Sequence, residues 1–218
     1  MARLARSSLD TVVADCPGWN GRDLIAHVGR VYAAVDALVS ARATSPVDPG
    51  ADGVAPDGDA VLEWFDERRR SLLATLQAVP GDTPVWTWAA SQNVAFYHRR
   101  LTHETAVHVC DLQRALGIEV EMHRDIAIDG IDEFYGEVAP SSLARGRRTI
   151  PSGSLHLHCT DGDGEWLIVP DNGNLVMTHE HAKGAVAWRG SAVGLVLSAW
   201  GRANTGVEAL GDAAISAE

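Results

Sequence analysis

The sequence predicts an N-terminal helical bundle over residues 1–119 and a smaller α+β domain over residues 120–218. Apolar residues recur at intervals of three and four in the first half of the chain, which is the period of amphipathic helices. In the second half they alternate with polar residues, which is the period of strands. The change near residue 120 indicates two domains, the first all-α and the second with a mainly antiparallel sheet.

The first half predicts three long helices and a short one, which together would form a four-helix bundle. Asn20 is the expected N-cap of the first long helix, and Gly117 is the expected C-cap of the last. The expected ranges are a short helix before Cys16, then about 20–43, Val61 to Val79, and Val94 to Leu116.

The second half predicts short strands joined by tight turns. Asp161-Gly162-Asp163-Gly164 and Asp171-Asn172-Gly173 are typical of hairpins. We expect strands at 125–129, 154–160, 165–169, 175–179, 185–188 and 207–210, and helices at 131–143, from Ser191 to Trp200, and partially at 212–215.

Composition excludes several functions. The formal net charge of −11 repels phosphate groups, so we expect neither a nucleic-acid nor a membrane partner. No apolar stretch is long enough to span a bilayer, and the first six residues lack a following apolar block, so no secretory signal is expected. Three widely spaced cysteines predict no disulfide framework. These observations predict a cytoplasmic protein. The sequence leaves open whether it is a monomer or a homodimer.

His27, Glu104 and His108 are candidate ligands for one divalent metal ion. Glu104 and His108 lie four residues apart and project from one side of their helix, while His27 lies on the inward arc of an earlier helix. A buried carboxylate between two imidazoles is costly unless a cation offsets the lost hydration. Two histidines and one carboxylate also leave coordination positions open, as in catalytic sites. Asp111 follows His108 by three residues, where it could orient the imidazole.

The same pattern allows less specific interpretations. An inward-facing histidine is more often a hydrogen-bonded core group than a metal ligand. His103 competes with Glu104 as a ligand, but its helical phase lies about 140° from His108, against about 40° for Glu104. We therefore expect His103 to face outward or to lie at the edge of its helix.

The second half contains two His-x-His pairs, His156 with His158 and His179 with His181. If their strands were neighbours, four imidazoles could form a separate metal site. Such pairs more often decorate a polar sheet face, so both readings stay open.

Two segments resemble the signatures of a known family. Residues 16–27 read Cys-Pro-Gly-Trp-Asn-Gly-Arg-Asp-Leu-Ile-Ala-His, and residues 99–108 read Arg-Arg-Leu-Thr-His-Glu-Thr-Ala-Val-His. They are similar to the CPGW-x-x-RDL-x-AH and RR-x-x-HETA-x-H signatures of the mycothiol-dependent maleylpyruvate isomerase family. Trp86-Thr87-Trp88 and Ala199-Trp200-Gly201-Arg202 also correspond to family segments, so the resemblance covers nearly the whole chain.

The resemblance implies a DinB-like four-helix bundle and a C-terminal domain similar to sterol-carrier folds. It implies that His27, Glu104 and His108 bind a divalent metal, usually Zn²⁺, and that mycothiol or another low-molecular-weight thiol is the co-substrate. The implied reaction is addition of the metal-bound thiolate to an activated double bond, which permits cis–trans isomerisation. It also implies that Arg202 is catalytic and binds an anionic substrate or the thiol.

We therefore expect a metal-dependent enzyme that is an isomerase or S-transferase for a small, maleylpyruvate-like electrophile, with that substrate and a thiol as its partners. A metal-dependent hydrolase of a thiol conjugate is the nearest alternative. A non-catalytic protein that binds a small ligand is the second. Dependence of turnover on the thiol distinguishes the isomerase or S-transferase from the hydrolase. Stoichiometric metal distinguishes both enzymes from the ligand-binding protein.

Overall fold

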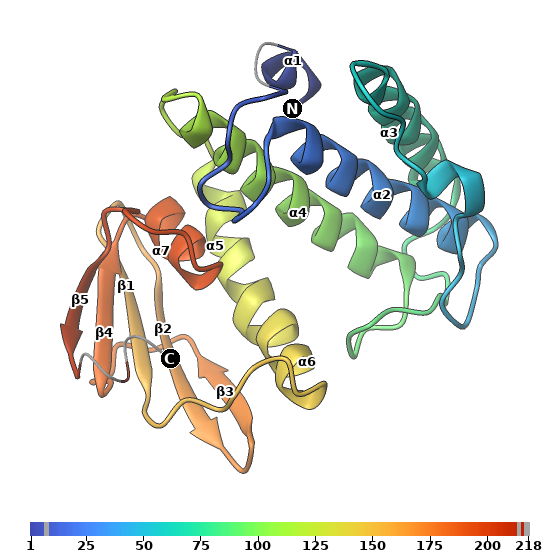
Figure 1. Cartoon of the computed structure of the whole chain (residues 1–218). Helices are drawn as coiled ribbons and strands as arrows, with labels where there is room; N and C mark the ends of the chain where they lie inside the picture. The colour runs from blue at the N-terminus through green and yellow to red at the C-terminus, as the bar shows by residue number, and fades with distance from the viewer. Residues whose placement is uncertain (7–8, 213–214, 216–218) are drawn as a thin grey trace. The chain divides into compact units, whose positions relative to one another are not determined.

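The computed structural model describes residues 1–6, 9–212 and 215. It divides into two compact units, Met1–Glu121 and Met122–Glu218. The first contains helices, and the second combines helices with a sheet (Figure 1). The predicted fold class, an all-α bundle followed by an α+β part, is confirmed.

The first unit contains the three long helices that the sequence predicted. The short helix expected before Cys16 is a single turn. The elements are α1 (Ala2–Ala5), α2 (Gly21–Ser40), the 3₁₀ turn η1 (Gly50–Gly53), α3 (Ala60–Ala78) and α4 (Val94–Ala115). Helix α2 packs against both α3 and α4 (Figure 1).

A capping box fixes the start of α2. The Asn20 side chain accepts a hydrogen bond from the Asp23 N–H at 3.0 Å, and the Asp23 carboxylate accepts one from the Asn20 N–H at 3.0 Å. Two of the four unpaired N–H groups at the helix start are satisfied in this way. With the first turn fixed, His27 falls in the second turn of α2.

The core of the first unit is formed by the apolar faces of these helices. Tyr32 of α2 and Phe65 of α3 have ring centroids 5.5 Å apart, and both side chains are buried. Burial of one such side chain stabilises the fold by about 1.5–3 kcal/mol. Other members of the core include Leu24, Ile25, Val28, Val35, Leu72, Val94, Tyr97, Leu101 and Leu112.

The second unit contains a five-stranded sheet in the order β3-β2-β1-β4-β5. Neighbouring strands are antiparallel except β1 and β4, which are parallel, so the predicted mainly antiparallel sheet is confirmed. Its elements are α5 (Arg124–Glu133), the π-helical turn η2 (Phe134–Val138), α6 (Ala139–Ala144), β1 (Leu155–Cys159), β2 (Glu165–Asp171), β3 (Asn174–Thr178), β4 (Val186–Gly190), α7 (Ala192–Ala199) and β5 (Glu208–Gly211).

The strand predicted over residues 125–129 is wrong, because this segment lies within α5. The alternation in Asp-Ile-Ala-Ile-Asp suggested a strand, yet the fully buried residues are Ala127 and Ile131, which are four apart. His123 Nδ1 accepts a hydrogen bond from the Asp125 N–H at 3.3 Å at the helix start. The helix predicted over 131–143 therefore begins earlier. Two of the four residues of the partial helix predicted over 212–215 lie outside the described residues.

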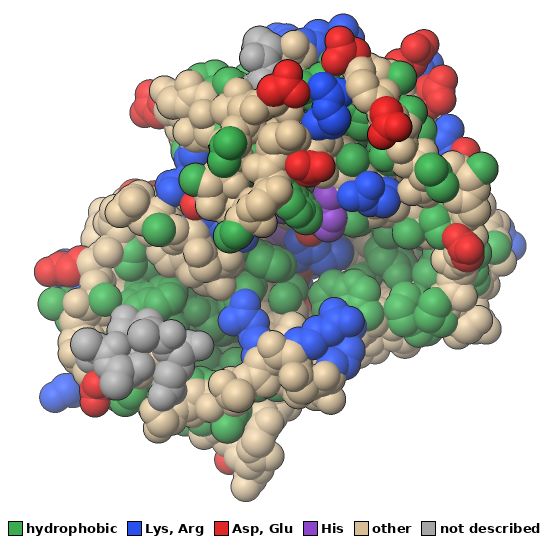
Figure 2. All heavy atoms as spheres, viewed as in Figure 1, with side chains coloured by type: hydrophobic (Ala, Val, Ile, Leu, Met, Phe, Trp, Pro, Cys, Tyr) green, Lys and Arg blue, Asp and Glu red, His purple; other side chains and the backbone are tan. Residues whose placement is uncertain are grey.

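Charged side chains are mixed on the visible surface. Acidic and basic groups are interspersed over the face shown in Figure 2, so the net charge of −11 is not gathered into one patch there. In the part of the chain that the structure describes, every helix is too short or too polar to cross a membrane.

Close packing of α2 against α3 at Gly29 gives a testable prediction. A Cβ at Gly29 would lie 2.2 Å from Trp64 Cζ3, and the Trp64 indole is held by a hydrogen bond to the Asp52 carbonyl at 3.2 Å. We expect Gly29→Ala to lower the free energy of unfolding by about 1–3 kcal/mol, because overpacking outweighs the better helix propensity of alanine. Urea denaturation measures this change.

A Trp64→Ala background provides the control. With the indole removed, the clash is absent, and Gly29→Ala should be neutral or stabilise the protein by up to about 1 kcal/mol. An equal loss of stability in both backgrounds would show that Trp64 does not constrain Gly29.

Candidate metal centre

His27, Glu104 and His108 lie together inside the helical unit. His27 comes from α2, and the other two come from successive turns of α4. Glu104 Oε1 lies 3.0 Å from His27 Nε2 and 3.3 Å from His108 Nε2, and the two imidazole centroids are 5.2 Å apart. One ligand atom from each residue is within 4.8 Å of the other two. The structure thus brings together all three of the sequence-predicted ligands.

The three side chains differ in access to solvent. His27 is 32% exposed, whereas Glu104 is 17% and His108 is 10% exposed. The cluster is therefore closed on the side of α4 and accessible beside His27. A ligand would approach from that side.

Asp111 and Arg100 hold the inner side of the cluster. The Asp111 carboxylate is fully buried, and its Oδ2 lies 2.8 Å from His108 Nδ1, which is the contact that the sequence predicted. The Arg100 guanidinium, itself only 7% exposed, donates to Glu104 Oε2 at 3.1 Å. His108 is thus fixed through Nδ1 and turns Nε2 toward the cluster.

These contacts set the protonation of the cluster. Burial disfavours the charged carboxylate of Glu104, but hydrogen bonds from His108 and His27 and the charges of His108 and Arg100 hold its pKa well below the ordinary value. Burial also opposes protonation of His108, yet hydrogen bonds with Asp111, Cys16 and Glu104 raise its pKa to about 11. Glu104 is therefore an anion that attracts positive charge to this point.

The donor set fits a divalent metal ion. Two imidazole nitrogens and one carboxylate oxygen are typical ligands of Zn²⁺ and of neighbouring transition metals. Three protein ligands leave at least one coordination position open.

A second set of donors shares His108. Cys16 Sγ donates a hydrogen bond to Asp111 Oδ2 at 3.5 Å, and these two residues with His108 also bring three ligand atoms together. In this set Asp111 Oδ2 lies 2.8 Å from His108 Nδ1. Asp111 is completely buried, so this set offers less access than the one that contains His27.

Sequence reasoning did not place Cys16 and Trp19 beside the cluster. It also did not show that the ion pair of Arg100 with Glu104 is buried. Gly18 has φ +83°, and the Trp19 N–H donates to the Cys16 carbonyl at 3.0 Å, so a tight turn places both side chains at the start of α2. The Trp19 ring lies 4.9 Å from that of His27. The Pro-Gly pair was the available signal for this turn.

The expectation for His103 is wrong. Its side chain is buried, with 3% exposure, rather than facing outward. It does not join the cluster among the described residues, as its helical phase predicted. Helical phase says which residues share a face, but α4 is buried on most of its faces, and phase alone does not reveal that.

Arg202 belongs to the second unit and follows α7. Gly201 has φ +78°, its N–H donates to the Ser198 carbonyl at 2.8 Å, and the Arg202 N–H donates to the Leu197 carbonyl at 2.9 Å. These two hydrogen bonds form the Schellman motif, which requires a left-handed backbone conformation at Gly201. The motif directs the chain so that Arg202 lines a cavity of about 690 Å³.

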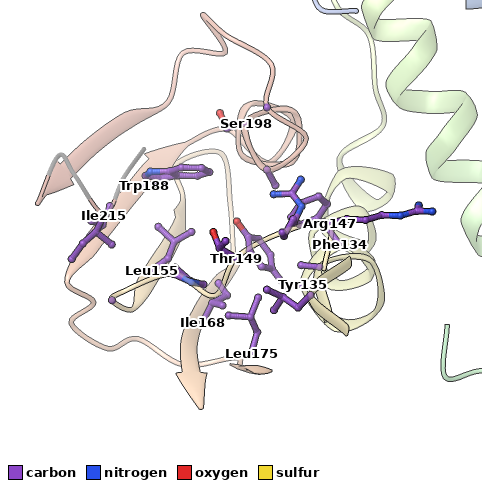
Figure 3. A pocket seen from close by; sticks show the side chains of 18 of the residues that line it. Phe134, Tyr135, Arg147, Thr149, Leu155, Ile168, Leu175, Trp188, Ser198 and Ile215 are labelled. Atoms are coloured by element: carbon purple, nitrogen blue, oxygen red, sulfur yellow. The ribbon is translucent and has the colours of Figure 1, made fainter. Parts of the chain in front are cut away.

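The cavity lies between the sheet and the helices of the second unit. Leu155, Ile168 and Trp188 come from the sheet, and Phe134 and Tyr135 come from η2 (Figure 3). The Arg202 guanidinium donates to the Trp200 carbonyl at 2.8 Å. An apolar wall with a nearby guanidinium suits a small molecule that carries an anionic group.

The fold and the cluster define a class of protein: a helical bundle with a buried His, Glu and His cluster, followed by an α+β unit. Within that class, the chain belongs to the mycothiol maleylpyruvate isomerase family, because the family model "Mycothiol maleylpyruvate isomerase N-terminal domain" matches residues 1–113. The resemblance predicted from the two signatures is thereby confirmed.

Two solved structures share the fold. The crystal structure of the mycothiol-dependent maleylpyruvate isomerase has a TM-score of 0.63 and 17% identity, and the match covers 95% of this chain and 86% of that one. A variant of that enzyme with a histidine replaced by alanine has a TM-score of 0.64 and 18% identity over the same shares. These neighbours are enzymes. No curated protein is significantly similar in sequence to this chain.

Proposed function

We propose that this protein is a metal-dependent enzyme that uses a low-molecular-weight thiol to act on a small electrophile. The thiol is mycothiol or a close analogue, and the reaction is cis–trans isomerisation or S-transfer on a maleylpyruvate-like substrate. The observation that carries the proposal is the convergence of His27, Glu104 and His108. Membership of the family and the names of the two solved neighbours support the choice of thiol and substrate class.

In this proposal His27, Glu104 and His108 hold a divalent metal, most simply Zn²⁺. When bound, such an ion lowers the pKa of a thiol and keeps the thiolate in place as a nucleophile. The thiolate can add to a double bond that is conjugated with a carbonyl group. The resulting single bond rotates, and elimination of the thiolate then gives the other isomer.

The surrounding residues have supporting roles. Asp111 keeps His108 Nε2 turned toward Glu104, and Arg100 holds the second oxygen of Glu104. Trp19 packs beside His27 at the accessible side of the cluster. There it would exclude water and give the thiol an apolar surface. Because a thiol co-substrate needs a reducing compartment, we propose that the protein acts in the cytoplasm.

We further propose that Arg202 binds a carboxylate of the substrate or of the thiol. The Schellman motif fixes the backbone of this residue, and its side chain lines the cavity of the second unit. A guanidinium pairs with a carboxylate through two parallel hydrogen bonds, which orients as well as binds.

Omission of the thiol tests the proposed function. With Zn²⁺-loaded protein and maleylpyruvate as the electrophile, turnover should require mycothiol, because the thiolate is the nucleophile. Replacing the ligand His108 with alanine should lower metal affinity by more than about 100-fold, beyond the usual effect of losing an orienting partner. The measurements are isomerisation followed by absorbance and metal content by elemental analysis.

The matched control is His98→Ala, since His98 is an exposed residue of the same helix. This variant should keep both metal and turnover. Equal turnover with and without thiol would contradict the role of the thiolate as nucleophile. Hydrolysis of a mycothiol conjugate without turnover of maleylpyruvate would instead favour the metal-dependent hydrolase. An absence of stoichiometric metal together with an absence of turnover would favour a ligand-binding protein.

Arg202→Gln gives a separate test of the substrate site. We expect the KM for a carboxylate substrate to rise by roughly 10- to 100-fold, because a charge-assisted hydrogen bond contributes about 1.5–3 kcal/mol. Arg202→Lys should recover part of this loss, since it keeps the charge without the paired geometry. Metal content should not change.

The control for Arg202 is Arg189→Gln, because Arg189 is a half-exposed residue of β4 that does not line the cavity. Steady-state kinetics with the substrate and with its neutral methyl ester measure the effect. An equal rise in KM for the acid and the ester would contradict a role in carboxylate binding.

A further inference from the structure

The sheet of the second unit gathers three histidines around one carboxylate. His156 and His158 share a face of β1, and Glu165 of β2 lies opposite His158 in the antiparallel register. His181 follows β3, which pairs with β2 on its other side. These residues come from separate parts of the chain, and the bundle ligands are not among them.

Glu165 is the centre of this group. Its Oε1 lies 2.7 Å from His158 Nδ1, and its Oε2 lies 2.7 Å from His181 Nδ1. The same Oε2 lies 3.7 Å from His156 Nε2. The imidazole centroids of His156 and His181 are 5.5 Å apart.

His156 carries a buried ring nitrogen that forms no hydrogen bond. The residue is only 7% exposed, and its Nε2 has no hydrogen-bond partner in the structure. Buried polar atoms are nearly always satisfied, and leaving one unpaired costs about 1–3 kcal/mol. The nitrogen points toward Glu165 but stays beyond hydrogen-bond distance of it.

The separation of His156 Nε2 from Glu165 Oε2 suits two ligands of one metal ion better than a hydrogen bond. Two ligand atoms at about 2.0–2.1 Å from a tetrahedral Zn²⁺ lie roughly 3.3–3.4 Å from each other. The 3.7 Å between His156 Nε2 and Glu165 Oε2 is close to that value. One ligand atom each from His156, Glu165 and His181 lies within 4.8 Å of the other two.

We propose that His156, Glu165 and His181 bind a second divalent transition metal ion of the Zn²⁺ class, independent of the candidate centre in the bundle. The ion would satisfy the buried nitrogen of His156 and link β1, β2 and the segment after β3. His158 holds the remaining Glu165 oxygen and orients the carboxylate. A hollow of about 580 Å³ lined by Glu165 and His181 has room for water as a fourth ligand.

His179 is nearby but has other partners. Its Nε2 lies 2.9 Å from Asp132 Oδ1, which also accepts a hydrogen bond from the Trp166 indole at 2.6 Å. His179 is two residues from His181 and is similarly exposed, at 63% against 80%. It is therefore the natural control for a histidine that is not a ligand.

The test is Zn²⁺ stoichiometry of the full chain, measured by equilibrium dialysis and elemental analysis after removal of all metal. His181→Ala should bind one equivalent less than the unmodified chain, and it should fold because the side chain is exposed. His156→Phe, which keeps the buried volume, should lose the same equivalent. His179→Ala should lose none.

The expected change is a difference of one equivalent whether or not the bundle binds metal. The test therefore distinguishes this proposal from the proposed function. In a His108→Ala background, His181→Ala should again remove one equivalent. With Co²⁺ as the probe in the same His108→Ala background, the Co²⁺ ligand-field bands should disappear on adding His181→Ala and persist on adding His179→Ala. Equal stoichiometry in His181→Ala and the unmodified chain would overturn the proposal, as would a loss in His179→Ala.

Discussion

The carboxylate of Glu104 is the group on which the rest of the helical unit's arrangement depends. It is largely buried and lies between two imidazoles and a guanidinium, so each neighbour must be held in place for the anion to be tolerated. The capping box at Asn20 sets the phase of α2 and hence of His27, and Gly29 allows α3 to approach closely. Asp111 fixes the orientation of the His108 imidazole through Nδ1. Local sequence features thus act together to place a few atoms.

Much of this arrangement could be predicted from the sequence, because helical phase and capping are local properties. The four-residue spacing of Glu104 and His108 placed both on one side of α4, and the arc of α2 placed His27 inward. Burial of His103 could not be predicted in this way, since it depends on how many neighbours surround α4. The contact between Cys16 and Asp111 joins residues 95 positions apart and follows only from the tertiary fold. The role of His27, Glu104 and His108 as metal ligands stays a prediction.

In the second unit, alternating polarity predicted some strands correctly and one wrongly. Alternation found β1 and the two hairpins, because one face of the sheet is buried. The same alternation misled over residues 125–129, where two isoleucines flank the fully buried Ala127 of a helix. The sequence showed the two His-x-His pairs but not that Glu165 would contact His158 of one pair and His181 of the other. Nor did it show that His179 would contact Asp132 instead. The register of β1 and β2 places Glu165 opposite His158. Register depends on the hydrophobic pattern and the turn geometry, which composition does not show.

We propose that the bundle holds a catalytic metal between α2 and α4. Crystals grown with Zn²⁺ and measured on both sides of its absorption edge would locate the ion directly. We expect an anomalous peak about 2.0–2.2 Å from His27 Nε2, His108 Nε2 and an oxygen of Glu104. A peak bound by Cys16 and Asp111 instead, or no peak beside Glu104 in crystals that contain Zn²⁺, would contradict it.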